Sequence, residues 1–179
     1  NTNGTLGGTG TVGQTTVNGT IAPGNSIGTL NVNGPYVQNA GSFYNVEVNA
    51  AGQSDLINVT GTATINGGTV RVIAGMGAYN PTTIYTILTS SGARTGTFTG
   101  VTSNFAFLDP SLTYDPNNVY LTLVRNSIDF ASVGQTPNQV SAGGGLAALG
   151  MANPIVAAAL MLTPDQARLV ALTLTEDQA

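Results

Sequence analysis

Four carboxylates in the body of the chain are the residues best suited to chemistry: Glu47, Asp55, Asp109 and Asp115. Two carboxyl groups on one face can cleave a glycosidic bond, one as general acid and the other as base or nucleophile. We interpret the last two as turn residues instead, because each is followed by proline, and Asp-Pro is typical of turns. We expect Glu47 and Asp55 at solvated or turn positions, and we predict no catalytic residues.

The residue types that most enzymes and metal sites need are missing. The 179 residues include no Cys and no His, which excludes a Ser-His-Asp triad, a thiolate nucleophile and a zinc site with nitrogen and sulfur ligands. Four arginines are scattered at 71, 94, 125 and 168, and the net charge is −4, so neither an anion clamp nor a nucleic-acid-binding surface is predicted. We expect Arg71 to face solvent, and we predict no metal, no cofactor and no nucleic-acid partner.

Glycines near the start of the chain imitate two known motifs. Gly8, Gly10 and Gly13 match the dinucleotide-binding pattern Gly-x-Gly-x-x-Gly, but the flanking residues indicate strand and turn, and no acidic residue lies near position 33. Residues 7–11 also begin like a calcium-binding nonapeptide, yet Thr11 and Val12 stand where the liganding Asp is needed. We therefore interpret these glycines as turn residues.

Short strands must position whatever the first 126 residues carry. Polar and apolar residues alternate over 29–34, 45–49 and 69–72, which is the period of a strand with one buried face. Four Asn-Gly pairs follow strand-like runs, at 3–4, 18–19, 33–34 and 66–67. Asn-Gly commonly marks a two-residue hairpin, but repeated strand–turn units also describe a solenoid. Because Thr, Asn and Val stack well on pleated faces, we favour a parallel β-helix with about 20 to 25 residues per coil and five or six coils.

A change of composition near Asn126 divides the chain into two regions. Before it lie 22 of the 26 Thr, and after it lie 11 of the 20 Ala. We predict a β-helix stem over 1–126 and an Ala-rich helical linker over 127–179. Four aromatics close in sequence are expected to cap the last coil, with ligand stacking as the less favoured alternative: Phe105, Phe107, Tyr114 and Tyr120.

Three helix starts are predicted in the second region. Residues 136–139 and 163–166 both read Thr-Pro-x-Gln, which is a capping box with proline in the first turn, and Asn153-Pro154 is a weaker start. Apolar residues at 167, 170, 171 and 174 continue the last helix with helical spacing. Three glycines at 143–145 put the continuity of the first helix in doubt, because each interior Gly costs about 1 kcal/mol relative to Ala.

Neither a membrane span nor a signal peptide is predicted. The longest apolar run, 155–162, is much shorter than the roughly 20 residues that a spanning helix requires. The first residues lack a charged segment followed by an apolar one. Since they already belong to the repetitive pattern, we expect the chain to be a piece of a longer protein.

Three segments carry a recognisable pattern: residues 18–30, with the element Ala-Pro-Gly-Asn-Ser, residues 54–61, with Ser-Asp-Leu-Ile-Asn-Val, and residues 85–88. Together they resemble the C-terminal passenger region of type V autotransporters of Gram-negative bacteria. Residues 118–126, followed by Phe130 and 136–139, resemble the last passenger strand and the start of the linker that precedes the outer-membrane barrel. The resemblance covers nearly the whole chain.

This resemblance implies a right-handed parallel β-helix, exported through the periplasm to the bacterial surface or secreted. The C-terminal coils would emerge first and template the folding of those upstream, as an autochaperone. The implied partners are the protein's own outer-membrane β-barrel and the outer-membrane assembly machinery. Two other functions remain open: an adhesive surface that binds host or neighbouring-cell molecules or itself, and a β-helical polysaccharide hydrolase or lyase.

Overall fold

The computed structural model describes residues 4–75, 77, 79–103, 105–126, 129–150, 153–160, 162, 163, 165–167 and 169. The chain forms two compact units. The first comprises Asn1–Gly75, Thr83–Ser103 and Pro110–Leu123, and the second comprises Met76–Thr82, Asn104–Asp109 and Val124–Ala179. The prediction of a mainly β chain with short helices toward its C-terminal end is confirmed.

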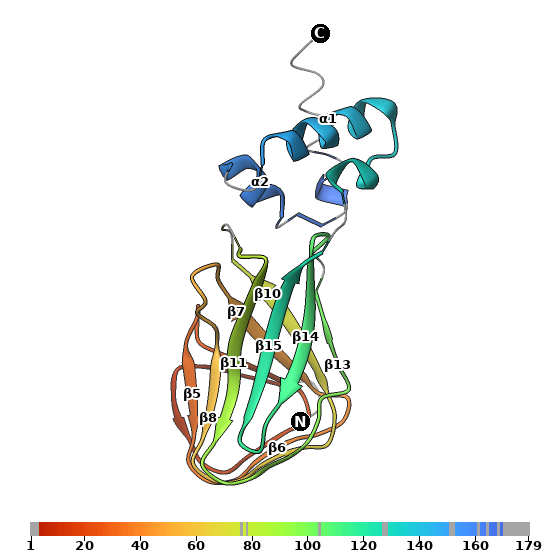
Figure 1. Ribbon diagram of the computed structural model, residues 1–179. Helices are drawn as coiled ribbons and strands as arrows, with labels where there is room; N and C mark the ends of the chain where they lie inside the picture. The colour runs from red at the N-terminus through yellow and green to blue at the C-terminus, as the bar shows by residue number, and fades with distance from the viewer. Residues whose placement is uncertain are drawn as a thin grey trace. The chain divides into compact units, whose positions relative to one another are not determined.

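Three sheets contain all the strands of the described residues (Figure 1). Along the chain, successive strands up to β14 belong to the first, second and third sheet in turn. The first sheet contains β1 (Thr5–Gly8), β4 (Thr20–Pro23), β7 (Phe43–Val48), β10 (Thr69–Ala74) and β13 (Gly100–Thr102). The second contains β2 (Gly10–Val12), β5 (Thr29–Val32), β8 (Leu56–Val59), β11 (Thr82–Ser90), β15 (Asn118–Arg125) and β14 (Leu108–Tyr114). The third contains β3 (Thr15–Val17), β6 (Tyr36–Gln38), β9 (Ala63–Ile65) and β12 (Arg94–Gly96).

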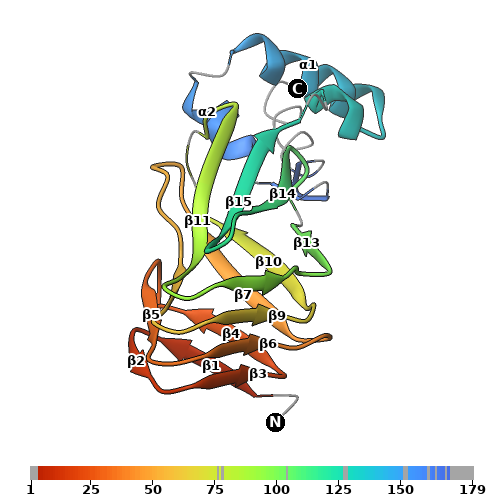
Figure 2. The same cartoon turned by 60° about the horizontal axis from the view of Figure 1, so that its bottom comes forward.

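Neighbouring strands are parallel throughout the first and third sheets and from β2 to β11 in the second, and Figure 2 shows them stacked in layers. Register partners lie progressively farther apart along the first sheet: Thr5 pairs with Thr20, Thr20 with Phe43, Phe43 with Thr69, and Thr69 with Gly100.

The Asn-Gly pairs with described structure do not form hairpins, the alternative that the sequence interpretation did not favour. The pair at 18–19 joins β3 to β4, the pair at 33–34 joins β5 to β6, and the pair at 66–67 joins β9 to β10. In each case the two strands belong to different sheets, so the pair turns a corner between sheets. The pair at 3–4 lies partly outside the described residues.

The core of the first unit is built from rows of inward-facing side chains. Buried and partly exposed residues alternate along β5, β7 and β8, as the strand period requires. Leu30, Ile57 and Leu88 are register partners on three neighbouring strands, and all three are buried. Burying each such side chain stabilises the fold by about 1.5 to 3 kcal/mol.

A row of glycines runs through the corners between the second and third sheets. A Cβ atom on Gly61 would lie 2.6 Å from the carbonyl carbon of Gly34, and one on Gly92 would lie 2.9 Å from the carbonyl oxygen of Gly61. The Gly92 N–H also donates to the Gly61 carbonyl at 2.9 Å. Gly13 occupies the corresponding corner between β2 and β3, and a Cβ atom there would meet nothing within 4 Å. Only glycine permits the corners after β5, β8 and β11 to stack this closely.

The stacking sequence ends in a pair of strands that differs from the rest. The turn between β14 and β15 is closed by a hydrogen bond from the Asp115 N–H to the Asn118 carbonyl, and Ser90, at the end of β11, donates to the carbonyl of Asn117. In Figure 1 the arrow of β15 runs opposite to those of β14 and β11. Of the four aromatics expected to form a cap, Tyr114 and Tyr120 lie in the first unit, and Phe105 and Phe107 lie in the second.

The second unit packs short helices around two phenylalanines. The 3-10 helix η1 (Phe130–Val133), α1 (Pro137–Ala148) and α2 (Pro154–Ala159) are its helical elements with described bounds. Phe107 and Phe130 meet edge to face with ring centroids 4.6 Å apart. Ala106, Val156, Ala159 and Leu160 complete the buried core around them.

The expected break in the first helix does not occur. The helix α1 continues through the three glycines at 143–145. Gly143 faces η1 so closely that a Cβ atom would lie 2.6 Å from the Cα atom of Ala131. Gly143 lowers the helix propensity of α1, but its missing side chain allows α1 and η1 to pack closely.

The predicted helix starts are confirmed where the structure describes them. Thr136 and Gln139 form a reciprocal capping box, Asn153 caps α2 with its side-chain oxygen, and Thr163 and Gln166 exchange the same pair of bonds as a capping box. The apolar positions predicted at 170, 171 and 174 lie outside the described residues. In the described part of the chain, no helix has the length and apolar character needed to cross a membrane.

Candidate functional site

Asp55 is a buried carboxylate that links separate segments of the first unit. It lies just before β8 with 1% of its surface exposed. Oδ1 accepts from the Gly28 N–H at 2.9 Å, and Oδ2 accepts from the Glu47 N–H at 2.8 Å. Burial raises the pKa of Asp55 to about 6, against the opposing effect of these two bonds. The expectation of a solvated or turn position is wrong for Asp55, because its carboxylate satisfies backbone groups inside the stack.

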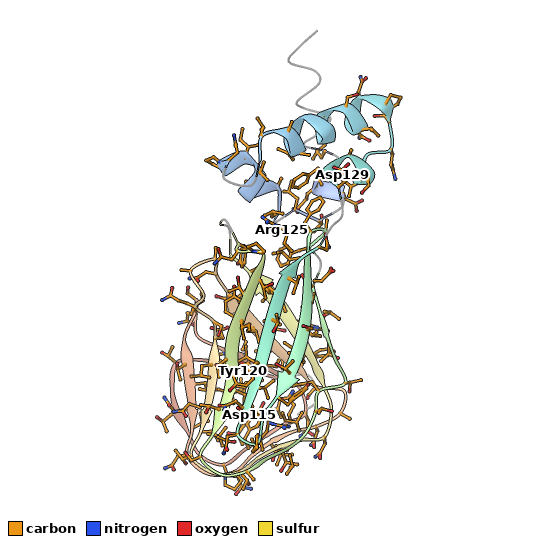
Figure 3. All side chains as sticks on the ribbon, viewed as in Figure 1. Asp115, Tyr120, Arg125 and Asp129 are labelled. Atoms are coloured by element: carbon orange, nitrogen blue, oxygen red, sulfur yellow. The ribbon has the colours of Figure 1, made fainter. Side chains whose placement is uncertain are left out.

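Asp115 organises the turn between β14 and β15. It accepts from the side chain of Asn118 at 2.9 and 3.0 Å, from the Tyr120 hydroxyl at 2.7 Å and from the Asn117 N–H at 2.7 Å (Figure 3). These bonds hold the pKa of the Asp115 carboxyl well below its usual range, with the Asn118 side chain contributing most. The prediction of a turn residue is confirmed here.

Asp109 lies within β14 and not in a turn, which corrects the sequence interpretation. Its Oδ1 accepts from the side chain of Asn126 at 3.0 Å. Of the four carboxylates, only Asp55 and Glu47 are neighbours, and both Asp55 oxygens already accept backbone hydrogen bonds. The geometry therefore assigns Asp55 to holding the stack, a role that leaves it poorly placed for acid–base chemistry on a sugar.

The described arginines lie on three different strands. Arg71 is exposed on β10, and its guanidinium carbon lies 3.3 Å from the centroid of the Phe43 ring. Arg94 donates from Nε to the Asp115 carbonyl at 2.9 Å and lies over the Tyr114 ring. Arg125 ends β15 in the second unit, and Arg168 lies outside the described residues.

One end of the first unit presents three strand edges together. Among the described residues, β1, β2 and β3 are the terminal strands of the three sheets. A hollow of about 230 Å³ lies beside β1, β3 and the start of β4, and Leu6 and Val17 contribute its apolar lining. Backbone N–H and C=O groups on such edges are available to pair with a further strand. Sequence reasoning anticipated an edge that needed closing only at the opposite end.

Asparagine side chains form hydrogen-bonded rows along the outside of the stack. Asn66 donates to the side-chain oxygen of Asn39 at 3.1 Å, and Asn39 donates to that of Asn18 at 2.7 Å. On a neighbouring sheet Asn58 donates to Asn31 at 2.8 Å. The sequence predicted that asparagines stack in this way, and these amides link neighbouring strands of one sheet.

A buried polar cluster inside the stack was missed by sequence reasoning. The hydroxyl of Tyr36 donates to Oε1 of Gln38, whose Nε2 donates to Oγ of Ser42 at 2.6 Å. All three residues are fully buried. Spacing could have revealed the first pair, since Tyr36 and Gln38 are two apart on one strand and share a face. The apolar pattern hid it, because glutamine is rarely placed in a core.

Neither unit offers a metal centre in its described part: no three residues of the types His, Cys, Asp and Glu come close enough to hold an ion.

Comparison with known proteins shows similarity to part of two long relatives. No protein-family model matches the sequence. The chain is 35% identical over 163 residues to an extracellular serine protease of Serratia marcescens, an alignment that takes 85% of this chain and 16% of the relative. A second extracellular serine protease of that organism is 30% identical over 141 residues, covering 74% of this chain and 13% of the relative.

The chain is similar to a short part of these proteases. It spans less than a fifth of their length, so their names describe much more than this segment. With no His in its sequence, the segment by itself lacks one member of a Ser-His-Asp triad.

Proposed function

We propose that the first unit is a right-handed parallel β-helix and that the chain is the C-terminal passenger stem of a type V autotransporter. In a coil with three strands per turn, each turn adds one strand to each of three parallel sheets. The strands β1 to β12 are arranged in this way. The motifs at 18–30 and 54–61 support this family, and so does the similarity to extracellular proteases. The proposed location is the bacterial surface or the medium.

The observation that carries a role in secretion and folding is the open end at β1, β2 and β3. Three parallel edges and an uncovered apolar hollow offer a preformed template, on which a preceding coil gains backbone hydrogen bonds and apolar burial together. The opposite end carries the antiparallel pair β14 and β15, which limits growth in that direction. A stem that folds first at the surface would then order the coils upstream, as an autochaperone does.

The proposed stem has no catalytic site of its own. Its carboxylates hold turns and coils, and any protease activity would reside elsewhere in a longer protein. The proposed partners are the protein's own outer-membrane β-barrel and the outer-membrane assembly machinery. Binding of these partners would accompany export and would not require a preformed pocket in the stem.

The test uses two substitutions on terminal strands of the open end, in the full-length protein on the bacterial surface. Leu6→Asp on β1 places a charge in the hollow that a preceding coil must cover, and burying that charge without a partner is strongly unfavourable. Thr11→Asp adds the same charge at an exposed position of β2 that does not line the hollow. We expect Leu6→Asp to leave the upstream passenger sensitive to added protease, while Thr11→Asp leaves it resistant.

Two controls separate templating from simple unfolding of the stem. The unfolding midpoint of the 179-residue chain is measured for both variants, and deletion of 70–126 provides the null case for export. Equal resistance of the upstream passenger in both variants would refute templating. Undiminished display after the deletion would refute a role of the stem in secretion.

An adhesive role is the second candidate, and the asparagine rows are the observation that favours it. Asn18, Asn39 and Asn66 present a straight line of amides along one corner of the stack. Such a row could hydrogen-bond a repetitive polar ligand. Absence of binding to cells, matrix and other copies of the chain in aggregation assays would exclude this role.

A further inference from the structure

A small cavity in the second unit combines an apolar floor with two opposite charges. Its volume is about 110 Å³. Phe107, Phe130 and Leu160, all buried, form the floor together with Ala147 on α1. The two phenylalanine rings meet edge to face, which fixes their orientation. The floor is thus a rigid apolar surface.

The charges come from Arg125 and Asp129, which both line the cavity and are both labelled in Figure 3. The backbone of Arg125 is held by a hydrogen bond from its N–H to the Pro81 carbonyl at 2.9 Å. Within the described residues, no hydrogen bond or ion pair engages its guanidinium group. Asp129 caps η1 through Oδ1, which accepts from the Ala131 N–H at 3.2 Å, and this leaves Oδ2 available.

Asn126 connects two segments that line the cavity through hydrogen bonds. Its side-chain amide donates to the Ala106 carbonyl and to Oδ1 of Asp109, both at 3.0 Å, and its N–H donates to the Phe107 carbonyl at 3.1 Å. The segment that carries Phe107 is therefore fastened to the segment that carries Arg125. A site built before its ligand arrives loses less entropy on binding.

The size of the cavity limits the ligand to one small apolar group. An engineered apolar cavity of about 150 Å³ accommodates benzene, so this one suits a single branched aliphatic side chain. The charges of Arg125 and Asp129 then select the polar group of the ligand. Arg125 would attract an anion that Asp129 repels, and Asp129 would attract a cation that Arg125 repels. A zwitterion can pair with both residues.

We propose that this cavity binds a free α-amino acid with a branched aliphatic side chain, such as leucine. The side chain rests on the phenylalanine floor, the carboxylate pairs with Arg125, and the ammonium group pairs with Asp129. The proposal goes beyond the role of the stem in secretion, and it concerns the second unit alone.

Calorimetric titration of the full 179-residue chain with L-leucine tests the proposal. We expect saturable binding of leucine, binding of N-acetyl-leucine and leucinamide weakened about tenfold or more, and no binding of glycine. Arg125→Gln and Asp129→Asn should each weaken leucine about tenfold to a hundredfold, as expected for loss of a charged hydrogen bond. Asparagine also serves as an N-cap, so the second variant preserves η1.

A matched pair on α1 tests the location of the site. Ala147→Leu fills the cavity, while Ala148→Leu adds the same side chain at the next position, and both keep a strong helix former. We expect the first to abolish binding and the second to leave it unchanged. Equal binding by the two variants, failure of leucine to saturate, or N-acetyl-leucine binding as tightly as leucine would each overturn the proposal. The last result would indicate the C-terminal residue of a polypeptide as the ligand.

Discussion

The glycine row at the corners after β5, β8 and β11 gives the sharpest prediction for stability. Gly61→Ala adds one methyl group, which would lie 2.6 Å from the carbonyl carbon and 2.7 Å from the carbonyl oxygen of Gly34. Contact at this range is well inside the ordinary separation of about 3.5 to 4.0 Å between carbon atoms. Both neighbours are backbone atoms with no side-chain freedom to yield, so two corners must move apart.

The expected loss follows from two opposing effects. Overpacking a close contact typically costs about 1 to 3 kcal/mol. Replacing Gly by Ala also restricts the unfolded chain, which stabilises by about 0.4 to 1 kcal/mol where the backbone suits Ala. Gly61 is not among the glycines with positive φ, so this gain applies. The net destabilisation should be about 1 to 2 kcal/mol.

Gly13→Ala is the matched control, because it lies at a corner between the same two sheets and its new methyl group would meet no atom within 4 Å. Urea unfolding is followed by far-ultraviolet circular dichroism and by tyrosine fluorescence, since the chain has six Tyr and no Trp. We expect Gly13→Ala to be neutral or slightly stabilising. If Gly61→Ala unfolds at the same urea concentration as Gly13→Ala, close stacking of the corners does not constrain the fold.

Three further predictions address burial, packing and charge. Ile57→Ala should lower the free energy of unfolding by about 2 to 5 kcal/mol, while Ile84→Ala, at a side chain 63% exposed, should change it by less than about 0.5 kcal/mol in urea unfolding. Gly143→Ala should lower the thermal midpoint of the second unit, because its methyl group meets the η1 backbone at 2.6 Å, whereas Gly144→Ala meets nothing and should raise it. The pKa of Asp55 is raised from 3.8 to about 6, so the folded chain binds this proton more tightly than the unfolded chain. Stability should therefore fall as the pH rises from 4 to 6, and Asp55→Asn should remove that slope from a series of urea midpoints.

The strands and the helix caps could be predicted because their signals are local. Alternation over 45–49 depends on the strand period alone, and the Thr136 cap depends on four consecutive residues. The Asn-Gly turns were harder to predict, because the same dipeptide occurs in hairpins and at corners between sheets. The two differ in which sheet the next strand joins, and the dipeptide itself does not show this. The repetition of the pairs along the chain favoured corners.

The misjudged residues depend on contacts between distant segments. The burial of Asp55 is tolerated because Gly28, 27 residues away in the sequence, donates to its carboxylate. Gly143 lowers helix propensity, but η1 requires its missing side chain. In the same way, Arg125 and Asp129 reach one cavity whose floor comes from Phe107 and from α1. No window of neighbouring residues carries this information.

The unequal spacing of register partners has a consequence for assembly. If every repeat had the same length, a strand could pair with the wrong neighbour and all later strands could still pair. Here far fewer residues separate Thr5 from Thr20 than separate Thr69 from Gly100. A shifted pairing would therefore leave some connections too long and others too short. Unequal lengths thus make each strand fit one neighbour, which limits misaligned pairing during folding.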